Sequence, residues 1–195
     1  IPNMRGKHLT RPIEQVIDPS SGAGIVSYVN AESANLFGIE LEARKSLDFI
    51  ADVLRPLSVI TNLTFAHSRV GLGEEALNLS SRSRPLSLQA PFVVNAALDL
   101  DLEQTRTRAR VQYNVVGARI YQVGTRGLPD VYEQPRHLLD VTVGQGIGEH
   151  VELRASATNL IDSPVRRRHE YDGPDAVTEE YTTGRTFSIG LGLSY

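Results

Sequence analysis

The chain ends with Gly184-Arg185-Thr186-Phe187-Ser188-Ile189-Gly190-Leu191-Gly192-Leu193-Ser194-Tyr195, a stretch with the regular alternation of a β-strand. Successive side chains of a β-strand point to opposite faces. From Phe187 to Tyr195, one face is entirely apolar or aromatic, and the other holds only serine and glycine. A strand at the exposed edge of a soluble sheet usually carries charges that prevent aggregation, and none follows Arg185. The stretch therefore fits either the closing strand of a membrane β-barrel or an interior strand of a soluble β-sandwich, and the other strands must decide between them.

Composition narrows the classes of protein to which the chain can belong. The 195 residues carry a net charge of -3, and this near-neutral balance argues against a nucleic-acid partner, which would need a basic excess. The sequence has no cysteine, so it offers neither disulfides nor thiolate metal ligands. No apolar run approaches the roughly 18 residues of a transmembrane helix. A membrane location would therefore have to come from strands.

The same alternation recurs along the chain and predicts an all-β, antiparallel transmembrane barrel fold of about eight strands. Residues 1–11 read as irregular, and residues 48–56 read as a short connection. We expect strands at residues 12–17, 25–44, 57–69, 92–103, 108–121, 139–143, 151–158 and 187–195.

The connections between these strands alternate in length. A turn cluster is expected at residues 18–24, long loops are expected at residues 70–89, 122–135 and 161–183, and short turns lie near residues 104–105 and 146–148. Outer-membrane barrels have short periplasmic turns and long extracellular loops, whereas a soluble sandwich has no reason to sort its loops in this way. The pattern predicts an outer-membrane location in a Gram-negative bacterium, with the C-terminus on the periplasmic side.

The polar faces of the expected strands are ionic. Charges of this density need water or mutual pairing, and a wet barrel interior supplies both. The residues expected to face the lumen or a plug are Glu40, Glu42, Arg44, Asp99, Asp101, Arg108, Arg110, Glu152 and Arg154.

Three motifs, in this order, carry a resemblance to a known family. Residues 30–42, Asn-Ala-Glu-Ser-Ala-Asn-Leu-Phe-Gly-Ile-Glu-Leu-Glu, are followed by Asn159-Leu160-Ile161-Asp162 and by Gly184-Arg185-Thr186-Phe187 with a terminal Tyr195. Together they resemble the C-terminal part of TonB-dependent outer-membrane receptors. The last strand also resembles the signal that the barrel-assembly machinery reads, carried by Phe187, Ser188, Gly190, Leu193 and Tyr195.

The resemblance implies a barrel of about 22 strands with a plugged lumen. Residues 1–195 would then be one partial domain, the C-terminal barrel segment, and Ile1 would be a cut end or the start of one piece of a split chain. The plug, the remaining strands and the part that meets the TonB energy-coupling protein would lie elsewhere. The implied function is uptake of a scarce large nutrient such as a siderophore, a vitamin or a glycan. The alternatives are a complete eight-stranded barrel and a non-transporting receptor-like barrel that acts as a structural or interaction protein.

No catalytic or metal-binding constellation emerges, so the sequence predicts neither an enzyme nor a bound cofactor. The five histidines lack metal-ligand spacing, and Asp99 and Asp101 read as part of a lumen charge ladder. The run from Arg166 to His169 reads as a solvated loop tip, or as a contact for lipopolysaccharide phosphates or an anionic ligand. The residues expected to bind ligand from the outer loops are Tyr121, Arg126, Tyr132, Arg166, Arg167, Arg168, His169, Tyr171 and Tyr181.

Overall fold

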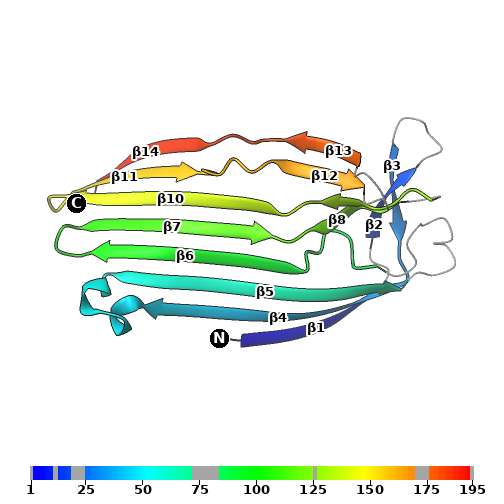
Figure 1. The fold of residues 1–195 in the computed structure, drawn as a ribbon, viewed down its shortest axis with the longest axis horizontal. Helices are drawn as coiled ribbons and strands as arrows, with labels where there is room; N and C mark the ends of the chain where they lie inside the picture. Colours follow the sequence, from blue (N-terminus) through cyan, green and yellow to red (C-terminus); the bar gives the residue numbers. More distant parts are fainter. Residues whose placement is uncertain are drawn as a thin grey trace.

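A computed structural model of the chain describes residues 2–10, 13–18, 25–71, 84–124, 127–169 and 176–193. The fold is all-β, and eight antiparallel strands form one large sheet in the order β1-β4-β5-β6-β7-β10-β11-β14 (Figure 1). The bounds of these strands are Pro2–Thr10 (β1), Ser33–Ser46 (β4), Leu57–Gly71 (β5), Phe92–Leu102 (β6), Thr107–Val116 (β7), Arg136–Ile147 (β10), Val151–Thr158 (β11) and Thr186–Leu193 (β14).

A second sheet extends the large sheet beyond its long-loop end. It has four strands in the order β13-β12-β9-β8, and each follows or precedes a strand of the large sheet in sequence, as Figure 1 shows. We call it the outer sheet. Its strands are Arg119–Gln122 (β8), Val131–Glu133 (β9), Val165–His169 (β12) and Ala176–Tyr181 (β13).

Two smaller units complete the described fold. β2 (Ile13–Asp18) and β3 (Ile25–Asn30) form a separate hairpin that lies between β1 and β4 in the sequence. β2 comes close to β8. Two short 3₁₀ turns, Leu47–Phe49 and Asp52–Leu54, connect β4 to β5 at the opposite end. Within the described residues, no helix is long and apolar enough to cross a membrane.

The strands of the large sheet are staggered. One row of cross-strand neighbours runs from Lys45, at the end of β4 next to the short turns, to Phe187, at the long-loop end of β14. The residues of this row are Lys45, Val59, Leu98, Val111, Val141, Ala157 and Phe187. Such a stagger is the shear that a sheet needs in order to curl into a barrel. In the described part of the chain, however, β1 and β14 remain the two free edges, and no pairing closes the sheet.

Several sequence predictions are confirmed and others are wrong. The alternating segments form antiparallel strands, and tight turns join β6 to β7 and β10 to β11 as expected. Residues 2–10, predicted to be irregular, form β1, whereas the strand expected at residues 12–17 is β2 of the small hairpin. The predicted loops 122–135 and 161–183 contain β9, β12 and β13.

Candidate functional site

The polar face of the large sheet brings together the charged residues that the sequence assigned to a lumen. On β6 and β7, Arg110 donates to both carboxylate oxygens of Asp99, over 2.6 and 2.8 Å. One pair nearer the turn, Arg108 lies 3.6 Å from Asp101. Because the register places each Arg directly opposite its Asp, the two strands form a short ladder of ion pairs.

The ladder continues across the neighbouring strands. On β11, Arg154 donates to Glu152 over 3.1 Å. On the other side, the amide of Asn62 on β5 donates to Glu40 on β4 over 3.3 Å. Glu42 and Arg44 follow Glu40 at the spacing of two that keeps them on the same face. All nine predicted lumen residues therefore lie on one face.

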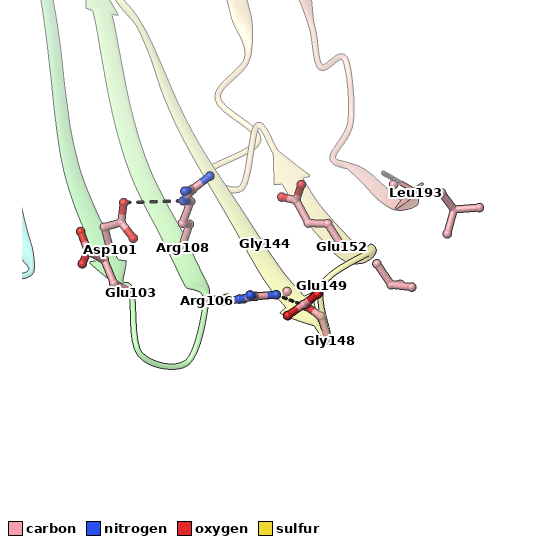
Figure 2. Close-up of a pocket in the computed structure, with 12 residues that line it drawn as sticks. Asp101, Glu103, Arg106, Arg108, Gly144, Gly148, Glu149, Glu152 and Leu193 are labelled. Carbon is pink, nitrogen blue, oxygen red and sulfur yellow. Dashed lines mark hydrogen bonds and ion pairs between the residues drawn. The ribbon is translucent and has the colours of Figure 1, made fainter. Parts of the chain in front are cut away.

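An open cavity of about 540 Å³ lies on this face at the end with the short turns. Figure 2 shows Asp101 and Arg108 on one side of it and Glu152 on the other, with Arg106 reaching to the carbonyl of Gly148. Asp101, Arg108 and Glu152 also line an adjoining cavity of about 370 Å³, which extends past Arg44.

Two glycines of β10 make room for the charged side chains. A Cβ at Gly144 would lie 2.9 Å from a carboxylate oxygen of Glu152, and one at Gly146 would lie 2.7 Å from the Cβ of Arg106. The backbone of β10 is thus the floor over which Glu152 and Arg106 extend. Both glycines lie on β10, in its antiparallel hairpin with β11. They therefore do not form a phosphate loop, which requires a following helix.

The opposite face of the large sheet is mainly apolar, and within the described ranges no other element covers it. On β14 the exposed fractions of Phe187, Ile189, Leu191 and Leu193 are 70%, 82%, 65% and 71%. Large apolar side chains on β4, β5, β6, β7, β10 and β11 are exposed on the same face, among them Phe37, Phe65, Leu98, Val111, Val143 and Leu153. Among the described residues, the buried apolar side chains are Ala31, Ala34, Val70, Val115, Ile120, Val123, Val131 and Val165, which lie towards the long-loop end.

The outer sheet carries a compact network of charges around Arg167. This guanidinium is 14% exposed and lies between the carboxylates of Glu133 (3.4 Å) and Glu179. The ring of Tyr121 lies beneath it, 3.6 Å from the guanidinium carbon to the ring centroid. Arg119 binds the other oxygen of Glu133 over 2.6 Å. The three strand pairings of the outer sheet thus share one mixed ionic and aromatic cluster.

The expectation that Arg166, Arg167 and Arg168 form a loop tip is therefore wrong. They lie on β12, where acidic residues of β13 and β9 stand directly opposite Arg166 and Arg167, and Val177 and Tyr132 stand opposite Arg168. Arg166 makes two hydrogen bonds to Glu180, of 3.1 and 2.8 Å. This hydrogen bonding holds the pKa of the Glu180 carboxyl below its ordinary value and raises the pKa of Arg166.

The other predicted ligand residues are dispersed over the outer sheet. Tyr132 packs against the buried Ile120 and Val123. Arg168 is paired with Tyr132 in the ladder, the Nδ1 of His169 lies 3.0 Å from the carbonyl of Pro129, and Tyr181 ends β13. Arg126 and Tyr171 lie outside the described residues, as does Tyr195 of the assembly signal, whereas Phe187, Ser188, Gly190 and Leu193 lie on β14. The described residues therefore do not bring the predicted ligand residues together into one pocket.

Asn159 is a structural residue whose role the sequence did not reveal. It has a φ of 57° at the break between β11 and β12. Its side-chain amide donates to the carbonyl of Gly184 over 2.6 Å, and its backbone N–H donates to Asp140 over 2.8 Å. Asp162, with a φ of 53°, closes the turn by donating its N–H to the carbonyl of Asn159. The Asn-Leu-x-Asp motif is thus the joint that ties three strands together where the large sheet meets the outer sheet.

Chemically, the site is a water-accessible ionic surface. Across the described ranges, no group of three or more histidine and acidic side chains is placed to hold a metal ion. No protein-family model matches the sequence, and no curated protein matches it. The functional proposal therefore rests on the two faces of the sheet and on the sequence motifs.

Proposed function

We propose that the chain forms part of the wall and the outer loops of a transmembrane β-barrel in the outer membrane of a Gram-negative bacterium. The main support for this proposal is that the large sheet exposes its apolar face instead of burying it in a core. One face holds the ion pairs of Asp99, Asp101 and Glu152, while the other presents exposed Phe, Leu, Ile and Val side chains along its whole width. In water such an exposed apolar face would promote aggregation, whereas in a membrane the acyl chains of lipids would cover it.

Aromatic residues on the apolar face support the same proposal. Phe37, Phe65, Phe92, Tyr113 and Phe187 lie towards the long-loop ends of five different strands. Their stagger follows the shear of the sheet, as a girdle at one membrane interface requires. At the opposite end, Phe49 lies beneath the ammonium group of Lys45, 5.5 Å from the ring centroid, in keeping with a second interface.

We propose further that this barrel belongs to a receptor of the TonB-dependent type that takes up a siderophore, a vitamin or a glycan. The three sequence motifs support the assignment. The ionic polar face supports it also, because charges of this density are harder to satisfy in a narrow lumen filled by side chains than in a wide one that leaves room for water or for a plug. In this reading, the polar face holds the plug and the outer sheet stands at the mouth where ligand is captured.

A second candidate is a complete eight-stranded barrel that acts as a structural or interaction protein of the cell surface. The directions of the edge strands allow it: β1 runs towards the long-loop end and β14 runs away from it, so the two edges could pair antiparallel. In the described structure they remain unpaired.

The mass and heat-modifiability of the membrane-extracted protein test both levels of the proposal. Outer-membrane barrels migrate differently on denaturing gels before and after boiling. A heat-modifiable band several times larger than 21.4 kDa would support the large receptor, and one near that mass would support the small barrel. A protein recovered in the soluble fraction without heat-modifiable migration would refute the membrane barrel altogether.

A further inference from the structure

A polar patch interrupts the apolar face of the sheet at its long-loop end. The register places His8 of β1, Asn35 of β4 and Arg69 of β5 side by side in one row. His67 lies two residues before Arg69 and therefore on the same face. We call these four residues the outer-rim patch. All four are exposed.

The patch has hydrogen-bonding capacity to spare. Nδ1 of His8 lies 2.7 Å from the amide oxygen of Asn35, an arrangement in which the Asn35 NH₂ group remains able to donate. Among the described residues, the side chains of His67 and Arg69 have no hydrogen bond or ion pair. The patch therefore presents an Arg fork, an amide donor and two imidazoles, and no carboxylate lies in the rows that contain them.

The apolar surface begins immediately beside the patch. Phe37 stands directly opposite His67 in the ladder, and Phe65 lies two residues before it. The exposed fractions of these rings are 51% and 50%. On the other face at the same level, Ala34 and Val70 are buried and pack with Leu9 and Leu86, so the patch opens on the side that bears the phenyl rings.

We propose that the outer-rim patch binds the phosphate of an anionic lipid headgroup in the outer leaflet, while an acyl chain of that lipid lies along Phe37 and Phe65. An Arg fork matches the geometry of phosphate oxygens. The juxtaposition of donors and phenyl rings fits an amphiphile better than it fits a free anion. The inference rests on the proposed membrane barrel, because only in a membrane would this side of the sheet meet lipid.

The test measures binding of a fluorescent lipid A, which carries phosphates and acyl chains, to the membrane-extracted protein in neutral detergent micelles. We expect R69Q to weaken this binding by roughly five-fold, since one basic residue near a membrane surface contributes about this much. The matched control is K7Q, which removes a cation next to His8 on the opposite face and should bind like the wild type. Dephosphorylated lipid A should bind the wild type as weakly as R69Q binds the intact lipid, and inorganic phosphate should not compete at equal concentration.

The failures are distinguishable. Both variants must keep heat-modifiable migration, which reports on the barrel independently of lipid. Equal binding by R69Q and the wild type, equal losses in R69Q and K7Q, or full competition by inorganic phosphate would overturn the lipid site and leave the barrel proposal standing. A wild-type protein without heat-modifiable migration would overturn the barrel proposal itself, and with it this site.

Discussion

Arg167 contributes more to the outer sheet than its position in a run of three arginines suggests. It is 14% exposed, it contacts carboxylates on two neighbouring strands, and it covers the ring of Tyr121. The described buried apolar side chains of this sheet are few, namely Ile120, Val123, Val131 and Val165, with Tyr132 packed against the first two. Polar pairing must therefore supply much of what holds β12 to its neighbours. Removing a largely buried cation from two acidic partners costs more than removing one member of a solvated surface pair, because the partners are left unpaired.

We predict that R167A destabilises the outer sheet by about 1–3 kcal/mol, because Glu179 loses its partner and Glu133 keeps only Arg119. R166A removes a more exposed pair and should have little effect. Limited proteolysis of the membrane-inserted protein would measure the difference as faster cleavage within β12 and β13. Equal cleavage of the two variants would contradict the role given to Arg167.

The neighbouring ion pair of Arg166 and Glu180 should make the stability of the folded state depend on pH. Arg166 lowers the pKa of Glu180 from its ordinary 4.5, so the carboxylate stabilises the folded state at all pH values above 4.5. That contribution is lost as the pH falls through the lowered folded pKa, when Glu180 takes up a proton. Nuclear magnetic resonance of labelled glutamate should show Glu180 titrating below 4.5, and R166Q should return it towards the ordinary value. Titration of Glu180 at or above 4.5 in the wild type would count against this pair.

At the scale of elements, the joint between the large sheet and the outer sheet depends on a residue that tolerates a left-handed backbone. Asn159 adopts a φ of 57° and donates to the carbonyl of Gly184, which itself has a φ of 77°. The chain thus leaves the regular strand conformation at the same level in two places, after β11 and before β14. Asparagine is among the few residues that accept this conformation readily, and it adds the hydrogen bond that glycine lacks.

We predict that N159A destabilises the folded protein by about 2–3 kcal/mol, from backbone strain together with lost hydrogen bonds. N159G keeps the backbone conformation and should cost only about 1 kcal/mol. The temperature at which the heat-modifiable form is lost would rank wild type above N159G and N159G above N159A. The reverse order of the two variants would mean that the backbone conformation is not what matters at this joint.

Whether the sequence revealed a strand depends on the interactions that hold that strand in its sheet. β6 and β14 alternate because one face needs apolar residues, and a period of two reports this directly. β1 escaped notice because Pro2, Gly6 and His8 share its apolar face with Met4, so the hydrophobic signal is weak although β4 pairs with every residue. β12 and β13 are held by opposite charges across the ladder. Such pairing is visible only once the two segments lie side by side, which also explains why Glu133 and Glu179 were missed.

At the scale of the whole molecule, the two faces of the sheet should respond oppositely to the same substitution. Leu98, near the middle of β6, lies on the apolar face between Val59 and Val111. Its neighbour Ala97 lies on the polar face beside Gln112. We predict that L98R destabilises the inserted protein by about 2–4 kcal/mol, as a charge facing lipid near the midplane does, whereas A97R is tolerated. The amount of heat-modifiable protein in outer membranes would measure both, and a tolerated L98R would argue that lipid does not cover this face.

The orientation of the molecule follows from which end carries the outer sheet. The short turn at Gln104 and the exposed Val177 of β13 lie at opposite ends of the strands. Long connections face outwards in outer-membrane barrels, so Val177 should lie outside the cell and Gln104 in the periplasm. Residues 1–195 contain no cysteine, so V177C and Q104C each introduce a single thiol into this part of the protein. We predict that a membrane-impermeant maleimide labels V177C but not Q104C on intact cells and labels both after lysis. Labelling of Q104C alone on intact cells would mean that the sheet is inserted the other way up, and the outer sheet could then not be a ligand-capturing mouth.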